Sequence, residues 1–438
     1  MNEQSTTSRI ELEFRRIFTV LNLKILLLNQ CFYPDVVSTA QHLTDLATAL
    51  VERGHSVTVV TSDRGYDDNS VKFHRSEHWR GISVIRIPSL SLGKSSRLRR
   101  GLNFASFLTT CALRLVTLGR FDVVIALTSP PLISFLGALL VKLRGGRFCF
   151  WVMDLNPDEA IAAGWLKPNS FTAKLLKRML VFSLNAASQI IVLDRFMRDR
   201  ILAKGVSPDR VIVVPPWSHD QAVSFTAEGR KAFRASHGLT ESFVVMYSGN
   251  HSPCHPLDTL LAAARELANV SEIKFLFVGG GSEKVKVQQF AKQWNLQNII
   301  SLPYQPLETL SHSLSAADLQ VVVMGDDFVG VVHPCKVYNI MTIGTPTLYI
   351  GPSESHVTDI AAKNSSQQFL ISAHGDKRQL VENILSVFES RNTPNSKSVE
   401  CHAFSEAALL PRLVSVIEEN PFESSSVSET IATDLSKV

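Results

Sequence analysis

Charged residues are scarce in this sequence. Asp, Glu, Lys and Arg together make up 19% of the 438 residues, whereas apolar residues account for 45%. Such a balance excludes a disordered or highly charged solvating chain, and 22 glycines with 19 prolines are too few for a collagen-like sequence. At roughly 150 residues per domain, the length predicts two globular domains that can each bury a core.

Paired cysteines and long apolar runs are also lacking. The six cysteines are scattered and include no Cys-x-x-Cys pair, which argues against a disulfide framework and favours a reducing compartment. The first twenty residues show no apolar core of a cleavable signal. The uncharged stretch Val123–Val141 has the length of a membrane span, but Pro130 and Pro131 interrupt it. The sequence therefore predicts no transmembrane helix.

Acidic residues are missing from Trp79–Phe121, although eight basic residues occur there. The eight are Arg80, Arg86, Lys94, Arg97, Arg99, Arg100, Arg114 and Arg120. The segment is either a solvated basic face or a surface that meets an anionic partner. Nucleic acid is not the expected partner, because the basic residues alternate with aliphatic residues and phenylalanine and no stacking platform accompanies them.

Strand-like runs alternate with amphipathic helices along most of the chain. A strand at 23–28, a helix at 39–53 and a strand at 56–61 form a βαβ unit, whose crossover requires a parallel sheet with helices on its faces. The alternation is interrupted by Pro215–Asp220 and resumes over Phe243–Ile350. The predicted fold class is therefore α/β, with two doubly wound, Rossmann-like domains that face an interdomain cleft.

This alternation divides the chain into five predicted segments. They are an N-terminal extension (1–22), a first domain (23–215), a second domain (216–400), a C-terminal helix that packs back towards the first domain (401–420) and a disordered tail (421–438). The tail is assigned from its high content of serine and threonine.

The strongest motif surrounds a short helix predicted at 336–341. Pro334 precedes its first turn, Lys336 lies within that turn, and Gly344-Thr345-Pro346 ends it. Free backbone N–H groups at the amino end of a helix, next to a lysine, suit a diphosphate. An ordinary capped helix has the same pattern, so the motif alone leaves both interpretations open.

Two glycine-containing turns follow strands of the second domain, Ser248-Gly249-Asn250 and Gly279-Gly280-Gly281-Ser282. Glycine lets the backbone approach a nucleotide closely, although it is also routine in βα turns. Neither turn matches G-x-G-x-x-G or a P-loop, so the dinucleotide and NTPase fingerprints are absent. His251, Cys254 and His255 lie nearby, but no further cysteine or histidine pair at zinc spacing accompanies them, so no metal site is predicted.

An acidic residue ends a very apolar strand of the first domain. Asp154 follows Trp151-Val152-Met153. A lone carboxyl group beside an apolar segment at the edge of a cleft can have a raised pKa and act as a general base. Asp154 or Asp158 could instead cap the following helix.

Six segments spread over the chain, including these motifs, form an ordered series. They are Cys31-Phe32-Tyr33-Pro34, Leu50-Val51-Glu52-Arg53-Gly54-His55, Asp154-Leu155-Asn156-Pro157-Asp158, Tyr247-Ser248-Gly249-Asn250-His251, Pro334-Cys335-Lys336-Val337-Tyr338 and Gly344-Thr345-Pro346. In this order they resemble GT-B glycosyltransferases of the family 4 type, from about Leu23 to about Glu419. The resemblance is closest to the bacterial branch that builds colanic acid, O-antigen and similar surface polysaccharides.

The resemblance implies transfer of a sugar from a nucleotide-sugar donor to a lipid-diphosphate-linked saccharide, with retention at the anomeric carbon and without a metal or other cofactor. The first domain would bind the acceptor and the second the donor. Lys336 would contact the donor diphosphate, with Tyr338 and Asn339 near the nucleotide or sugar. The glycine turns would contribute Ser248, Gly249, Asn250 and Gly280. Asp154 is the candidate for activating the acceptor.

A lipid-linked acceptor stays in the bilayer, so the first domain would have to reach an anionic membrane surface. The candidate docking residues are Arg97, Arg99, Arg100 and Arg114, beside apolar residues at helical spacing in 102–118. The expected location is cytoplasmic, peripherally associated with the inner face of the plasma membrane.

Three features depart from the family pattern. Val331 and Asn339 stand where many members have two glutamates spaced E-x7-E, and His251 and His255 lie near the place of the usual Arg and Lys. The glycine pair usual in the first acceptor loop is replaced by Val36-Val37-Ser38-Thr39. Two alternatives therefore stay open, a sugar-nucleotide epimerase of the same architecture and a catalytically silent partner that binds a nucleotide-sugar.

Overall fold

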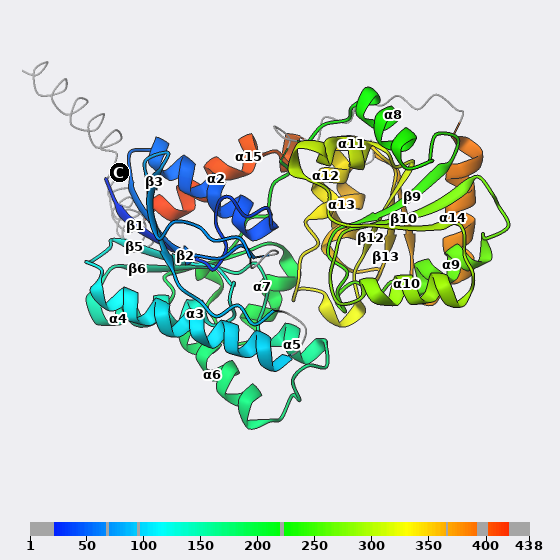
Figure 1. Cartoon of the computed structure of the whole chain (residues 1–438). Helices are drawn as coiled ribbons and strands as arrows, with labels where there is room; N and C mark the ends of the chain where they lie inside the picture. The colour runs from blue at the N-terminus through cyan, green and yellow to red at the C-terminus, as the bar shows by residue number, and fades with distance from the viewer. Residues whose placement is uncertain are drawn as a thin grey trace, which may run out of the picture. The chain divides into compact units, whose positions relative to one another are not determined.

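The computed structural model describes residues 22–66, 70–93, 97–219, 223–364, 367–391 and 402–419. It contains two β-sheets, each with helices on both of its faces (Figure 1). The predicted α/β class with two Rossmann-like sheets is therefore confirmed. The predicted extension before residue 22 and the predicted tail 421–438 lie outside the described residues.

The first sheet has eight strands. They are β1 (Lys24–Leu28), β2 (Ser56–Ser62), β3 (Ser76–Trp79), β4 (Ile82–Ile87), β5 (Val123–Ala126), β6 (Arg147–Trp151), β7 (Gln189–Val192) and β8 (Val211–Val213). Their order is β3-β4-β2-β1-β5-β6-β7-β8. From β4 to β7 neighbouring strands are parallel, whereas β3 is antiparallel to β4. Residues 25–28 of β1 are fully buried, as expected for a strand covered on both faces.

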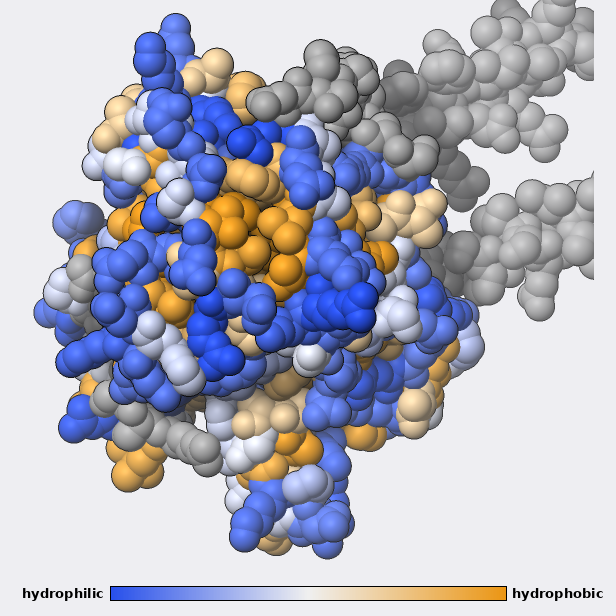
Figure 2. Space-filling model, turned by 90° about the vertical axis from the view of Figure 1, so that its right-hand side faces the viewer, coloured by the Kyte–Doolittle hydropathy of each residue, from blue (hydrophilic) through white to orange (hydrophobic). Residues whose placement is uncertain are grey.

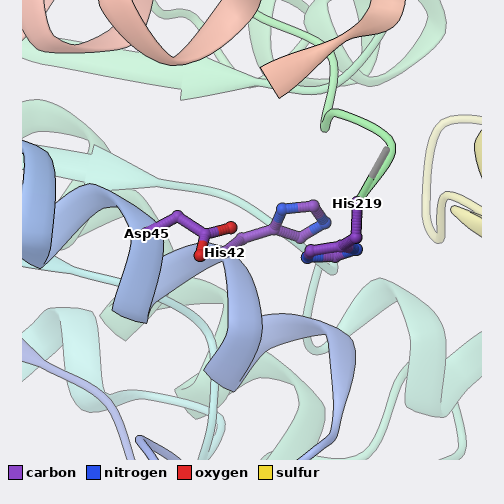
Figure 3. Close-up of side chains that lie close together, drawn as sticks. All are labelled: His42, Asp45 and His219. Atoms are coloured by element: carbon purple, nitrogen blue, oxygen red, sulfur yellow. The ribbon is translucent and has the colours of Figure 1, made fainter. Parts of the chain in front are cut away.

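Six helices lie between the strands of this sheet along the chain. They are α2 (Ser38–Glu52), α3 (Arg97–Thr117), α4 (Ile133–Arg144), α5 (Asp158–Ala162), α6 (Phe171–Ala186) and α7 (Arg195–Leu202). A further helix, α15 (Glu406–Glu418), follows the second sheet in the chain. Leu43, Leu46 and Leu50 of α2 are buried, at the three- and four-residue spacing of one helix face. His42 and Asp45 extend from the same helix (Figure 3). The predicted helix at 39–53 is confirmed to within one residue at each end.

The second sheet has six strands. They are β9 (Phe243–Ser248), β10 (Ile273–Val278), β11 (Ile299–Leu302), β12 (Leu319–Val323), β13 (Thr347–Ile350) and β14 (Phe369–Ser372). All neighbours in the order β11-β10-β9-β12-β13-β14 pair in parallel. The order reverses between β9 and β12, so the carboxyl ends of these two strands mark the place where such sheets bind ligands.

Two apolar layers fill the space between this sheet and its helices. The helices are α8 (Ala227–Ser236), α9 (Asp258–Glu266), α10 (Lys284–Gln293), α11 (Leu310–Ser315), α12 (Lys336–Ile343), α13 (His356–Lys363) and α14 (Lys377–Ser390). Val245 and Tyr247 of β9 face the layer that contains α9 and α14. Val244 and Met246 face the layer that contains Phe233 of α8, as the two-residue period of a strand requires.

The chain forms two compact units, and both are discontinuous in sequence. Among the described residues, the first comprises 22–151, 178–191 and 410–419, and the second comprises 152–177 and 192–409. The strands of the first sheet all lie within the predicted domain 23–215, and those of the second sheet lie within 216–400. Residues 152–177 and 192–215 nevertheless pack with the second unit. The division of the chain into compact units therefore does not follow a single cut in the sequence.

Helix α15 belongs to the first unit from residue 410 onwards. Ile417 is fully buried, and Arg53 forms a bidentate ion pair with Glu418. Arg147 donates to the carbonyl oxygens of Ile417 and Glu419. A guanidinium group at this position satisfies carbonyl groups that the end of a helix leaves free and suits the helix dipole.

Helix α3 carries an exposed apolar stripe. Four of its apolar residues are 44–74% exposed, namely Leu98, Leu102, Leu113 and Val116. At 3.6 residues per turn, these four lie within about 60° of one another around the helix axis. Phe107 and Leu115 are buried in the core, so the apolar residues predicted for membrane docking divide between core and surface.

None of the helices in the described part of the chain combines the length and the hydropathy that a bilayer span requires. Figure 2 shows a separate feature of the surface: apolar side chains gather near the centre of this face, and hydrophilic residues surround them.

Candidate functional site

Several predicted donor residues come together in the second unit, where the turns after β9 and β10 lie beside the amino end of α12. β9 ends at Ser248 and β10 at Val278, and both turns continue with glycine. The Nζ atom of Lys336 lies 3.1 Å from the position that a Cβ atom on Gly249 would occupy. The ends of two strands and the start of one helix therefore define a common site.

The two glycine turns approach each other closely. Gly249 and Gly279 both have a φ of 132°, in a region that L side chains rarely adopt. A Cβ atom on Gly279 would lie 2.0 Å from the carbonyl oxygen of Gly249. Glycine is therefore required at position 279, and the backbone of both turns stays free of side chains that would separate it from a ligand.

Lys336 is the first residue of α12, and its ammonium group has no hydrogen-bond acceptor among the described residues. The Nζ atom is buried and lies 3.7 Å from the centre of the Tyr247 ring, in a cation–π contact. Burial lowers the pKa of Lys336 to about 7. Because a buried charge without a counter-ion is costly, an anionic ligand at this helix terminus would be stabilised.

Lys284 differs from Lys336, although it also lies beside a glycine turn. Its ammonium group donates to the carbonyl oxygens of Gly279 at 2.6 Å and Leu302 at 2.7 Å. Lys284 therefore holds the turn after β10 in place, whereas Lys336 keeps its hydrogen-bonding capacity for a ligand.

His251 links the two glycine turns. Its Nδ1 atom lies 3.0 Å from the carbonyl oxygen of Gly249 and 3.3 Å from that of Gly280, so Nδ1 carries the proton and donates it. Its Nε2 atom is a buried acceptor that has no partner in the described part of the chain. Burial and the charge of Lys336 lower the pKa of His251 to about 4. The ring is therefore neutral at pH 7 and does not replace the positive charge of an arginine or lysine.

The neighbouring residues His255 and Cys254 have different partners. His255 donates from Nδ1 to the carbonyl oxygen of Val323 at 2.8 Å, and burial lowers its pKa to about 3. The Sγ atom of Cys254 lies 3.8 Å from Oε1 of Glu159. Over the described ranges, His251, Cys254 and His255 do not form a group of potential metal ligands.

Asp154 and Glu159 are two partly buried carboxyl groups of the same unit that interact electrostatically. Burial raises the pKa of Asp154 to about 8, and the charge of Glu159 adds to the increase. Burial also raises the pKa of Glu159, against the hydrogen bonds from Asn156 and Cys254. The pair therefore retains at least one proton at neutral pH.

Asp154 does not cap the helix that follows it. The N-cap position of α5 is Pro157, which makes no side-chain cap hydrogen bond. Asp158 is the first residue of α5 and forms an ion pair with Lys204 at 2.8 Å. Neither Asp154 nor Asp158 therefore occupies the N-cap position that the alternative interpretation gave them.

A buried cluster beside the amino end of α12 was not predicted. His333 donates from Nδ1 to Asp194 at 2.7 Å, and its Nε2 atom lies 2.8 Å from the hydroxyl oxygen of Tyr338. Burial tends to raise the pKa of Asp194, but the hydrogen bond and charge of His333, with smaller contributions from His356 and the Met197 N–H, lower it to about 2. The sequence offered little indication of this cluster. Asp194 directly follows a strand and His333 belongs to the motif around Lys336, but the two residues are far apart in the chain.

The other predicted site residues have varied environments. Asn250 is exposed, and its carbonyl oxygen accepts a hydrogen bond from Tyr247. The Asn339 side chain accepts from the backbone N–H of His219 at 3.3 Å, whereas Tyr338 is only 2% exposed. Arg99, Arg100 and Arg114 belong to α3 of the first unit, and the side chain of Arg97 lies outside the described part of the chain.

A cavity of about 460 Å³ lies elsewhere in the second unit. Its walls come from the segments after β9, β12 and β14, with Pro256, Phe328 and His374 among the lining residues. None of the predicted donor residues lines it. The chemistry of the site therefore has to be argued from Lys336 and the glycine turns, and not from this cavity.

Comparisons with known proteins cover most of the chain. Residues 39–217 match the family described as Glycosyl transferase 4-like domain, and residues 229–404 match Glycosyl transferases group 1. WcaI of Escherichia coli K12, named as a colanic acid biosynthesis glycosyl transferase, is 26% identical over 336 residues. These residues make up 74% of this chain and 82% of WcaI.

Solved structures share the fold at lower sequence identity. Sucrose-phosphate synthase of Thermosynechococcus elongatus superposes with a TM-score of 0.68 and 16% identity, over 90% of this chain and 97% of that one. HepE of Anabaena, solved in complex with UDP-glucose, gives a TM-score of 0.62 and 14% identity, over 95% and 100% of the two chains.

Proposed function

We propose that this chain, which belongs to the GT-B glycosyltransferases, moves a sugar from a nucleotide-sugar to a lipid-diphosphate-linked saccharide in surface-polysaccharide biosynthesis. The family assignment rests on a glycosyl transferase 4-like domain followed by a group 1 domain. The observation that carries the proposal is the buried ammonium group of Lys336, which lacks an acceptor among the described residues. The UDP-glucose complex of HepE supports a nucleotide-sugar as the anionic ligand. The name of WcaI supports surface-polysaccharide assembly as the process.

The donor diphosphate is proposed to bind Lys336 and the amino end of α12. When the glycosidic bond to the donor breaks, negative charge develops on the departing diphosphate. An ammonium group and the free N–H groups of a helix terminus stabilise such charge without reorganising. Protein groups thus supply the neutralising charge, and the proposed reaction needs no metal ion. Retention at the anomeric carbon is proposed from the family resemblance.

Asp154 is proposed to activate the acceptor hydroxyl as a general base. It lies in the same compact unit as Lys336, and the charge of Glu159 acts on it. A base must be deprotonated, and the pKa of Asp154 is about 8. Its role therefore requires that the proton of the carboxyl pair resides on Glu159 or has left the pair.

The exposed stripe of α3 (Leu98, Leu102, Leu113 and Val116) is proposed to dock the first unit on the anionic inner face of the plasma membrane. Apolar side chains of this stripe would enter the headgroup region. Arg99 lies next to this stripe on the same helix, whereas Arg100 and Arg114 lie about 100° or more away from it around the helix axis. A basic residue near an anionic surface contributes about 1 kcal/mol. The proposal places a cytoplasmic protein beside its lipid-linked acceptor.

A thermal-shift screen across UDP-, GDP-, ADP- and dTDP-sugars tests the donor proposal. A donor present at one hundred times its dissociation constant should stabilise the protein by about 2.7 kcal/mol. A tenfold weaker affinity in Lys336→Ala should reduce this stabilisation to about 1.4 kcal/mol. Lys286→Ala is a matched control, because Lys286 is half exposed and pairs with Asp258 on the surface. Equal shifts for Lys336→Ala and wild type would contradict the proposal.

Donor turnover separates the proposal from its two alternatives. A transferase should consume the donor rapidly only when a lipid-linked saccharide is added. Epimerisation of the donor in the absence of acceptor would indicate the epimerase, and binding without any consumption would indicate a silent partner.

A further inference from the structure

Asp194, His333 and Tyr338 form a continuous hydrogen-bonded chain in the second unit. The distances are 2.7 Å from Asp194 to His333 and 2.8 Å from His333 to Tyr338. All three residues are buried, with 6%, 7% and 2% of their surface exposed. Buried polar groups of this kind restrict the conformations of the segments that carry them, because breaking one bond leaves an unpaired group in the core.

His333 links the other two members of the chain through its two ring nitrogens. Its Nδ1 atom donates to the carboxylate of Asp194. Its Nε2 atom shares a hydrogen bond with the hydroxyl group of Tyr338. Both ring nitrogens of His333 are therefore engaged.

A metal site at the neighbouring group Asp194, His333 and His356 is not supported by the ring geometry. The rings of His333 and His356 are stacked, with centroids 3.7 Å apart and planes inclined by 24°. Two nearly parallel stacked rings cannot both direct an in-plane lone pair at one ion. Nδ1 of His333 also donates to Asp194 already. The cluster is therefore a hydrogen-bonding unit.

The position of the chain relative to Lys336 gives it a role. His333 lies three residues before Lys336 and Tyr338 two residues after it, and both are tied directly or indirectly to Asp194. Asp194 is itself held, because its second carboxylate oxygen accepts from the backbone N–H of Met197 at 2.7 Å as the N-cap of α7. The first turn of α12 is thus anchored on both sides of its lysine.

Backbone contacts strengthen the same anchorage. Arg200 of α7 donates to the carbonyl oxygen of Val329 at 2.6 Å. The backbone N–H of Leu155 donates to the carbonyl oxygen of Val331 at 2.8 Å. A Cβ atom on Gly330 would lie 2.6 Å from the backbone of Phe196. The segment before α12 therefore packs tightly on the start of α7.

We propose that Asp194, His333 and Tyr338 are positioning residues that hold the first turn of α12 so that Lys336 faces the donor diphosphate. The inference rests on the proposed function of Lys336. None of the three residues needs to touch the donor. Their effect on binding passes through Lys336, which distinguishes the proposal from a general contribution to stability.

Hydrogen–deuterium exchange of the nucleotide-free protein tests the anchorage. Tyr338→Phe removes one hydroxyl group and keeps the ring, and it should speed exchange of amides at 336–341 about tenfold. Thr342→Val is the matched control, because it removes another hydroxyl of α12, one that donates to the carbonyl oxygen of Tyr338. The control should exchange like wild type. Unchanged exchange in Tyr338→Phe would overturn the proposal.

A double-mutant cycle tests the passage of the effect through Lys336. The probes are UDP, GDP, ADP and dTDP, titrated calorimetrically into wild type, Tyr338→Phe, Lys336→Ala and the double variant. Tyr338→Phe should raise the dissociation constant about five- to tenfold, with little change in kcat, and should have no further effect in the Lys336→Ala background. An equal loss in both backgrounds would overturn the positioning role. If wild type binds none of the four nucleotides, the proposed function fails, while the exchange result still decides the anchorage.

Discussion

The ammonium nitrogen of Lys336 lies 3.7 Å from the centre of the Tyr247 ring. A cation–π contact contributes about 0.5 to 2 kcal/mol, which offsets part of the cost of burying the charge. A charge-assisted hydrogen bond to a phosphate oxygen is stronger, at roughly 1.5 to 3 kcal/mol. Tyr247 therefore stabilises the charged ammonium group of Lys336 in the free protein, and a diphosphate, which binds this group more strongly, can displace the cation–π contact.

Lys336→Ala should weaken binding of a nucleoside diphosphate about tenfold or more, because each 1.4 kcal/mol corresponds to about a factor of ten. The measurement is a calorimetric titration, with circular dichroism to confirm folding. Lys286→Ala should bind like wild type. A folded Lys336→Ala protein with wild-type affinity would remove Lys336 from the donor site.

Nucleotide binding should weaken as the pH rises above 7. The pKa of Lys336 is about 7 in the free protein, so its charge is present below this pH and is lost above it. A bound diphosphate raises the pKa of the lysine, so binding above pH 7 must take up a proton. Affinity should then fall by up to about tenfold per pH unit. Titrations between pH 6.5 and 9 check this, and an identical slope in Lys336→Ala would contradict it.

Asp154→Asn should lower turnover about a hundredfold or more while leaving donor binding intact. In wild type, turnover should rise with pH through about 8, because only the deprotonated carboxyl group is a base. Glu159→Gln removes the charge that adds to the raised pKa, so the rising limb should move to lower pH. Initial rates at saturating donor measure both effects. Wild-type turnover in Asp154→Asn would transfer the role to another residue.

Asp194→Asn should destabilise the second unit at neutral pH and lose this effect in acid. The pKa of Asp194 is lowered from 3.8 to about 2, so its ionised form contributes stability above pH 4 that disappears as the pH falls through 2. The shift corresponds to about 2 kcal/mol. Urea unfolding at pH 7, 4 and 3 should show the difference from wild type shrinking. A difference that does not depend on pH would assign the loss to packing.

Replacing Leu113 and Val116 by serine should release much of the protein from anionic vesicles, because both side chains are about two-thirds exposed on α3. Arg99→Ser with Arg100→Ser should have a similar effect at low salt and less at high salt. Val285→Ser on α10 is a matched control with an exposed apolar side chain. Vesicle co-sedimentation gives the measurement. Equal sedimentation of every variant would exclude this stripe as the docking surface.

Local pattern was sufficient to predict most of the fold. The strands β1 and β2 and the helix α2 lie close to their predicted positions, because buried parallel strands and one-sided helices have clear sequence periods. Strand β3 was missed, since Ser76-Glu77-His78-Trp79 is short, polar and paired only at a sheet edge. Strand β14 was missed as well, because its pairing with β13 is not evident from its own four residues.

The candidate site was predictable only where its residues are close in sequence. Lys336 stands beside Pro334 in a recognisable helix start, and Gly249 follows a clear strand. The bond between His333 and Asp194 joins residues 139 positions apart, which no local pattern reveals. The burial that shifts the pKa of His251 and Lys336 likewise depends on the packed structure.

The discontinuity of the first unit affects the order in which the protein can fold during synthesis. The described residues up to 151 leave the ribosome well before α15, whose Ile417 is buried and whose Glu418 pairs with Arg53. The second unit is nearly complete before the first receives its final helix. The surface that α15 will cover therefore stays open during much of translation, and a ribosome-bound chain stalled before residue 410 should be an effective substrate for chaperones that recognise exposed apolar surface.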